Sequence, residues 1–100
     1  MRRLTATLCL TLAVLLGSAG VSVSQDFQKG SDAYNRGDYA LALREFTPLA
    51  EQGDADAQFN LGLMYRNGEG VQQDHKESAK WFRRAAEQGH AGAQSRLGFM

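Results

Sequence analysis

Residues 50–64 read AEQGDADAQFNLGLM, and residues 86–100 repeat the pattern as AEQGHAGAQSRLGFM. When residues 38–64 are aligned on residues 74–100 without a gap, twelve of the twenty-seven aligned pairs are identical. Self-similarity at a fixed period of roughly 20–50 residues is typical of repeat architectures. The sequence therefore predicts a domain built from stacked copies of one structural unit, whose use is a surface that binds something else.

Length and charge narrow the class of protein. A chain of 100 residues allows one domain at most. Eleven basic residues balance eleven acidic ones, whereas a protein that binds nucleic acid is expected to carry a clustered positive face. We therefore expect no nucleic-acid partner.

The first 24 residues have the order of a secretory signal peptide: a positive start, an apolar run over Leu4–Leu16, and small residues up to Ser24. The apolar run is shorter than the roughly 20 residues that a membrane-spanning helix needs. We expect cleavage after Ser24, with Ala19 as the alternative site. Residues 25–100 would then form the repeat domain, with no stable membrane span. An uncleaved N-terminal anchor is the rival interpretation.

Export also bears on the stability of the domain. The single cysteine, Cys9, lies inside the apolar run and would be removed with the signal peptide. The mature domain would have no disulfide bonds, although exported proteins often use them, and packing alone would hold it together. We expect a periplasmic or secreted protein of the bacterial envelope.

Apolar residues recur at helical spacing in five segments of the remaining chain. We expect helices over residues 26–36, 39–51, 54–66 and 75–87, and a fifth that begins near residue 91. No segment shows the alternation of a half-buried strand. The expected fold is all-α, with two helix-turn-helix pairs and the first half of a third.

Local residues predict where these helices begin and end. Asp38, Asp54 and Asp74 stand where a helix N-cap is expected, because an aspartate side chain can accept a hydrogen bond from a free backbone N–H. Gly53 and Gly89 follow the second and fourth helices, where a residue with left-handed backbone angles commonly ends a helix. Each boundary therefore has its own chemical reason.

Two features inside the expected helices need an explanation. Pro48 lacks a backbone N–H and clashes with the carbonyl four residues earlier, so we expect a kink there. Gly62 and Gly98 occupy equivalent repeat positions, and each costs about 1 kcal/mol relative to alanine in a helix. We expect close contact at both glycines, with a neighbouring backbone or with a ring such as Phe46 or Phe82.

The consensus-like residues lie in three stretches: AEQGxAxAQxxLG at residues 50–62, MYxNGxGV at 64–71 and AxWFxxAA at 79–86. Together they resemble the Sel1-like repeat, a relative of the tetratricopeptide repeat, and nearly every consensus position of one unit is filled. Residues 30–46 look more like an ordinary tetratricopeptide unit. The resemblance covers residues 26–100 and implies a right-handed α-solenoid with a role in protein–protein assembly.

The resemblance also implies where a partner would bind. In such solenoids the first helix of each pair lines a concave face. Carried over to this chain, the partner-binding positions are Phe27, Tyr34, Asn35, Asp56, Phe59, Leu63, Arg66, Asn67 and Phe99. Aromatic and arginine side chains are enriched at binding hot spots, which favours a protein or peptide partner. The alternative is that Phe59, Leu63 and Phe99 are core residues.

No arrangement of residues predicts catalysis, a cofactor or a metal. The Ser-x-x-Lys motif of serine β-lactam enzymes is absent at Ser31, Ser78 and Ser95. His75 and His90 lie fifteen residues apart, and a metal site needs three or four convergent ligands. We expect a non-enzymatic protein with no catalytic or metal-binding residues.

Two alternatives remain open. Some secreted members of the family have been linked to penicillin binding and weak β-lactam hydrolysis, and those members are cysteine-rich. A self-associating structural fragment is the other alternative, because stability usually needs three or more repeat units. In that case the last helix would associate through Leu97, Phe99 and Met100.

Overall fold

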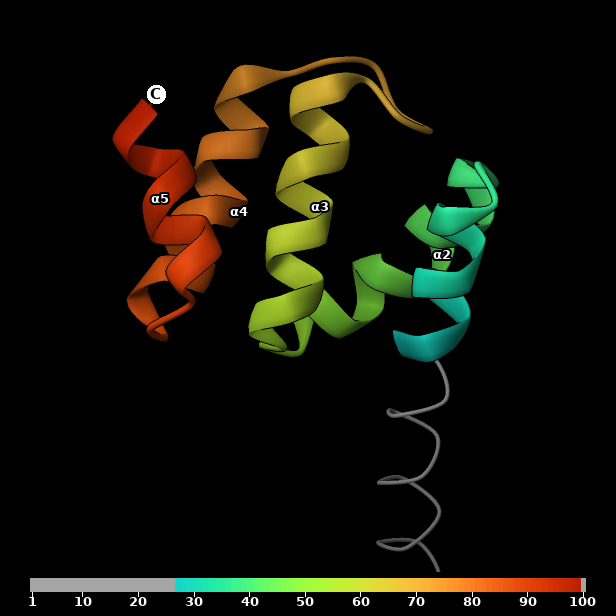
Figure 1. The fold of residues 1–100 in the computed structure, drawn as a ribbon, viewed down its shortest axis with the longest axis horizontal. Helices are drawn as coiled ribbons and strands as arrows, with labels where there is room; N and C mark the ends of the chain where they lie inside the picture. Colours follow the sequence, from blue (N-terminus) through green and yellow to red (C-terminus); the bar gives the residue numbers. More distant parts are fainter. Residues whose placement is uncertain (1–26, 100) are drawn as a thin grey trace, which may run out of the picture.

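A computed structural model describes residues 27–99, so the predicted signal peptide and its cleavage sites lie outside the described residues. Residues 27–35 are helical and are followed by α2 (Tyr39–Glu51), α3 (Ala55–Asn67), α4 (His75–Glu87) and α5 (Ala91–Phe99) (Figure 1). Within residues 27–99 there is no strand. The all-α prediction is confirmed, and the bounds of α2 and α4 agree with those expected.

All three predicted N-caps are present. The carboxylate of Asp38 accepts from the backbone N–H of Leu41 at 3.3 Å, and Asp54 accepts from Ala57 at 2.9 Å. Asp74 accepts from the N–H groups of both Lys76 and Glu77, at 3.0 and 3.1 Å. Each bond satisfies a donor that the first helical turn leaves free, so the helix starts are fixed locally.

The proline in α2 does not end the helix, which continues beyond Pro48 to Glu51. Beside it, the Thr47 hydroxyl donates to the carbonyl of Leu43 at 2.7 Å. The proline removes one backbone donor but is tolerated within a continuous helix. A bend of the helix axis at this point stays a prediction.

The helices pack in chain order, so that each touches the next. α2 packs on α3, α3 on α4, and α4 on α5. Figure 1 shows this succession as a row, with the segment 68–74 crossing from α3 to α4 at one end. Such a row is the arrangement of an α-solenoid, in which each repeat contacts its neighbours and no single centre exists.

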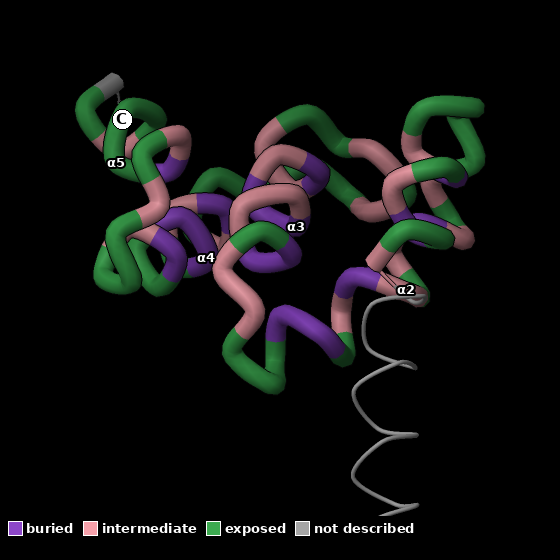
Figure 2. The backbone as a smooth tube through the Cα atoms, turned by 60° about the horizontal axis from the view of Figure 1, so that its bottom comes forward, coloured by how far each residue is buried: buried purple, intermediate pink, exposed green. Residues whose placement is uncertain are grey.

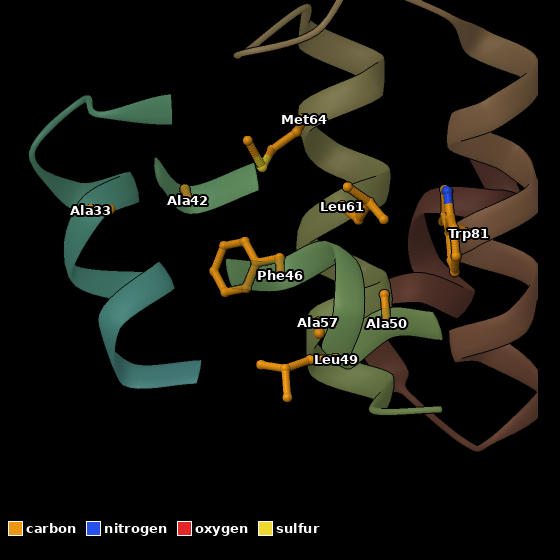
Figure 3. Close-up of a cluster of buried hydrophobic side chains, with 9 residues drawn as sticks. All are labelled: Ala33, Ala42, Phe46, Leu49, Ala50, Ala57, Leu61, Met64 and Trp81. Carbon is orange, nitrogen blue, oxygen red and sulfur yellow. The ribbon is translucent and has the colours of Figure 1, made fainter. Parts of the chain in front are cut away.

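Two apolar clusters fill the spaces between the helices, and the buried stretches of each helix lie on its inner side (Figure 2). The first cluster comprises Ala33, Ala42, Phe46, Leu49, Ala50, Ala57, Leu61, Met64 and Trp81 (Figure 3). The second comprises Phe82, Ala85 and Ala93, with Phe59, Leu63, Ala86 and Leu97 packed around it. Phe46 and Phe82 are the largest fully buried side chains, one in each cluster.

The two phenylalanines meet glycines on the preceding helices. A Cβ atom on Gly62 would lie 2.6 Å from the ring of Phe82, and one on Gly30 would lie 2.9 Å from the ring of Phe46. The contact expected at Gly62 is therefore confirmed. The expectation for Gly98 is wrong, because no atom of the described residues lies within 4 Å of its Cβ position. The glycine is repeated there, but the ring that would fill the gap is not.

A second contact supports α4 against α3. Ser78 is fully buried, and its hydroxyl donates to the carbonyl of Gly62 at 2.8 Å. A buried hydroxyl without such an acceptor would destabilise the fold. The side chain therefore marks the line along which the two helices touch, one turn from Phe82.

Candidate partner-binding surface

The segment between α3 and α4 joins the two helix pairs through one carboxylate. The Tyr34 hydroxyl donates to Oε1 of Glu69 at 2.8 Å, and the Asn67 amide reaches the same oxygen at 3.4 Å. Gly70 follows with a φ of +75°, and a Cβ atom there would lie 2.8 Å from the carbonyl oxygen of Tyr39. Only glycine allows this close approach, so the segment rests directly on the start of α2.

The environment of Tyr34 keeps its hydroxyl protonated. Burial raises the pKa of Tyr34 to about 12, and the hydrogen bond to the Glu69 carboxylate raises it further in the same direction. Both effects disfavour the phenolate, the first by removing water and the second by placing a negative charge beside it. The hydroxyl is thus a stable donor that holds Glu69 beside the first helix.

A second cluster joins α3 to the start of α5. The His90 ring stacks on Phe59 with centroids 4.6 Å apart and an interplanar angle of 21°. Its Nε2 lies 3.0 Å from a carboxylate oxygen of Asp56, and its Nδ1 accepts from the backbone N–H of Ala93 at 3.2 Å. With Nδ1 accepting, Nε2 carries the proton and donates to Asp56. His90 therefore caps α5 and ties it to α3.

This arrangement corrects the expectation that His90 is simply an exposed polar residue near a helix start. The side chain is 18% exposed, whereas that of Asp56 is 69% exposed. Asp56 is accordingly both available to solvent and held in place. The sequence signal that could have located this contact is position 90 itself, where histidine replaces the N-cap aspartate found at position 54 of the preceding repeat.

The apolar residues expected on the partner surface all take part in packing. Phe27 lies against Phe46 with ring centroids 5.6 Å apart, and Phe59 lies against Phe82 at 5.7 Å. Leu63 packs beside the second cluster, as does Leu97, one of the residues expected to mediate self-association. All four side chains except those of Phe46 and Phe82 keep part of their surface exposed.

The polar residues expected on the same surface reach solvent. Asn35, Asp56 and Asn67 are exposed, and Arg66 is half-buried with its carbonyl accepting from the Gln73 amide at 2.8 Å. The structure gathers Asn67 and Tyr34 around Glu69, and Asp56 and Phe59 around His90. The side chains of Phe99 and Met100 lie outside the described residues.

Several kinds of site were sought within residues 27–99. This part of the chain contains no pocket and no group of three or more side chains placed to bind a metal ion. None of its helices is both long enough and apolar enough to cross a membrane. What the described residues offer is an open surface along the first helices, with polar side chains set between partly exposed aromatic rings.

Comparison with known proteins gives three matches. Residues 55–90 match the model of the Sel1 repeat family. The alginate biosynthesis protein AlgK of Pseudomonas syringae pv. tomato is 39% identical over 61 residues, which is 61% of this chain and 13% of AlgK. The crystal structure of a Sel1 repeat protein from Oxalobacter formigenes superimposes with a TM-score of 0.73 at 34% identity.

The extent of these matches limits what each can carry. The structural match covers 89% of this chain but 38% of the Oxalobacter protein, so both relatives are much longer than the region they share with this chain. What is shared is the repeat itself: the aligned sequence, the paired helices and the glycine that receives an aromatic ring. The chain belongs to the Sel1 repeat family.

Proposed function

We propose that this chain is an exported, non-enzymatic adaptor that binds a protein or peptide partner on the surface formed by the first helices of its pairs. Sel1 repeats commonly serve as protein–protein interaction modules. The observation that supports this surface most directly is the exposure of Asn35 and Asn67, two amides at matching positions of successive first helices.

The match between the two positions is geometric as well as sequential. Asn35 and Asn67 are the last helical residues of 27–35 and α3. Each follows by eight residues a phenylalanine that packs against the second helix of its own pair. The bond between Tyr34 and Glu69 then joins the ends of these two helices. Two amides are thereby held at one edge of the solenoid.

An asparagine side chain suits the recognition of an extended peptide. Its amide both donates and accepts hydrogen bonds, so it can pair with an N–H and a C=O of the same backbone. Two such amides on neighbouring helices would contact separate peptide units of one ligand. The partly exposed rings of Phe27 and Phe59 lie on the same helices and would supply apolar contact, the component that usually dominates binding energy.

The test is crosslinked co-purification from the envelope fraction with three forms of the chain: wild type, Asn35→Ala/Asn67→Ala, and Gln52→Ala. Gln52 is an exposed amide at the end of α2, a second helix, and serves as the matched control. We expect one discrete partner that is captured by the wild type and by the control but not by the double variant.

Equal capture by all three forms would contradict the assignment of the surface. Self-crosslinks alone, equal in all three forms, would favour the structural alternative, in which copies of the chain associate through Leu97, Phe99 and Met100. The name of AlgK refers to alginate biosynthesis, but the match covers 13% of that protein, so the proposal does not depend on that process.

Export has its own test, which is the intact mass of the chain recovered from the periplasm or medium. Cleavage after Ser24 would leave a chain that begins at Gln25, and cleavage after Ala19 one that begins at Gly20. We expect the first of these masses. Recovery of the uncleaved chain in the membrane fraction would favour the N-terminal anchor instead.

The β-lactam alternative lacks a nucleophile at its most buried serine. The Ser78 hydroxyl is fully buried and is engaged by the carbonyl of Gly62, so a substrate could not reach it without opening the contact between α3 and α4. We expect no covalent labelling of the chain by a fluorescent penicillin. A labelled band that an excess of unlabelled penicillin abolishes would overturn the non-enzymatic proposal.

A further inference from the structure

We infer that the outer face of α5 is a docking surface for an amphipathic helix of another protein, one that presents a small hydroxyl residue, an aromatic residue four positions later and an amide ten positions after the hydroxyl. These are the positions of Ser78, Phe82 and Gln88 in α4. The surface is separate from the one proposed for the adaptor function, and it follows from a comparison of α3 with α5.

The two helices have matching sequences but different environments. Gln58, Leu61 and Gly62 of α3 are buried beneath α4. Their counterparts thirty-six residues later are Gln94 and Gly98, which are exposed, and Leu97, which is half-buried. The face that α3 buries is therefore repeated on α5 and left open to solvent. The clearest difference is the glycine, which receives the Phe82 ring in α3 and meets nothing within 4 Å among the described residues in α5.

The polar groups that α4 uses on α3 also recur. The Gln88 amide donates to the carbonyl of Gly53 and to Oε1 of Gln58, both at 2.9 Å. Ser78 donates to the carbonyl of Gly62. The counterparts of these three acceptors are the carbonyl of Gly89, Oε1 of Gln94 and the carbonyl of Gly98. No side chain of the described residues donates to any of them.

The Gln94 side chain already has the orientation that its counterpart uses. The Gln58 amide donates to the carbonyl of Ala50, eight residues earlier, at 3.0 Å. The Gln94 amide donates to the carbonyl of Ala86, also eight residues earlier, at 3.2 Å. In both repeats the donor half of the amide is thus held by the preceding helix, which leaves Oε1 to accept from an incoming helix. The site is preformed in this respect, which lowers the entropic cost of binding.

The occupant has to be a helix with the chemistry of α4, because continuity with the α3–α4 interface defines each contact. A second folded copy of this chain does not supply such a helix. Its own Phe82 and Ser78 are fully buried against its own α3, so α4 would have to detach before it could dock elsewhere. We therefore assign the surface to a helix from a different polypeptide.

The probe is a fluorescent peptide with the sequence of residues 74–89, titrated by anisotropy into the full chain. We expect saturable binding that weakens at least tenfold in Gly98→Leu, because the new side chain fills the space meant for the aromatic ring. Arg96→Leu is the matched control. It adds a leucine to the same helix about 200° away from Gly98, at roughly 100° per residue, and should leave binding unchanged.

A second peptide, in which the residue corresponding to Phe82 is alanine, should also bind at least tenfold more weakly. Circular dichroism would check that Gly98→Leu stays folded, as expected where no atom opposes the added side chain. Three outcomes would overturn the proposal: no saturable binding, equal binding to wild type and Gly98→Leu, or self-association that Gly98→Leu abolishes and the peptide does not compete with. Asn35→Ala/Asn67→Ala should bind the peptide normally, which separates this test from that of the adaptor surface.

Discussion

The two helix pairs make the same aromatic contact although different lengths of chain connect their helices. In the first pair Phe27 and Gly30 meet Phe46, and in the second Phe59 and Gly62 meet Phe82. The ring centroids lie 5.6 and 5.7 Å apart, with interplanar angles of 53° and 42°. Yet the connection is residues 36–38 in the first pair and the longer segment 68–74 in the second. The pairing of the helices therefore depends on the ring and the glycine, not on the turn.

The extra residues of the longer connection have a different use. They include Glu69, which binds Tyr34, and Gly70, which lies against the backbone of Tyr39. Both contacts reach back to the first pair. A short turn closes one pair, whereas the longer segment also fixes the second pair to the first. The pairs also differ at one buried position, where Ser78 in the second corresponds to Ala42 in the first.

The largest expected effect comes from removing either ring. Phe82→Ala and Phe46→Ala should each lower the free energy of unfolding by about 3–5 kcal/mol, because each ring is fully buried and leaves a cavity. Urea unfolding followed by circular dichroism measures both. If the two contacts are equivalent, the two losses should be similar. A loss below about 1 kcal/mol in one variant alone would show that only one pair depends on its ring.

The next effect comes from the glycines. Gly62→Ala should destabilise by about 1–3 kcal/mol through overpacking, since its Cβ would lie 2.6 Å from the Phe82 ring. Gly30→Ala should cost less, because the corresponding distance is 2.9 Å. Gly98→Ala is the matched control: nothing opposes the methyl group, and a helical glycine replaced by alanine gains up to about 1 kcal/mol. Thermal unfolding of the three variants gives the order, and destabilisation by Gly98→Ala would contradict it.

The sequence predicted the features of the fold that depend on neighbouring residues. Asp38, Asp54 and Asp74 mark helix starts because an N-cap bond reaches only three residues ahead. The repeat also predicted close contact at Gly62. It predicted the same at Gly98, wrongly, because a sequence repeat carries the receiving surface but says nothing about what covers it.

Contacts between distant residues were missed for a related reason. Tyr34 and Glu69 are thirty-five positions apart, and Asp56 and His90 are thirty-four apart. Neither pair follows from helical periodicity. Tyr34, Asn67, Asp56 and Phe59 were all expected on one partner surface, but the residues that organise them, Glu69 and His90, were not. Whether a partner binds there stays a prediction.

A smaller effect is expected at the serine that distinguishes the pairs. Ser78→Ala removes one buried hydrogen bond and should cost about 0.5–1.5 kcal/mol in the free energy of unfolding. The reverse change in the first pair, Ala42→Ser, sharpens the comparison. If the pairs are equivalent, the new hydroxyl finds the carbonyl of Gly30 and the change costs less than about 1 kcal/mol; an unpaired buried hydroxyl would cost about 1–3 kcal/mol.

The smallest effect is expected at the bond that joins the pairs, and it depends on pH. The pKa of Tyr34 is raised to about 12 by burial and by the Glu69 carboxylate, above the ordinary value of about 10. Between these values the folded chain keeps a proton that the unfolded chain has lost. The contribution of Tyr34 to stability is therefore complete below about pH 10 and is lost as pH rises through about 12.

Comparison with Tyr34→Phe isolates this contribution, because phenylalanine keeps the ring and has no proton to lose. We expect the free energy of unfolding to fall more steeply between pH 9 and 11 in the wild type than in Tyr34→Phe. Glu69→Gln keeps an acceptor but removes the negative charge, so the pKa of Tyr34 should fall and the steep region should move to lower pH. Parallel curves for all three forms would mean that the longer connection fixes the pairs through the Gly70 contact alone.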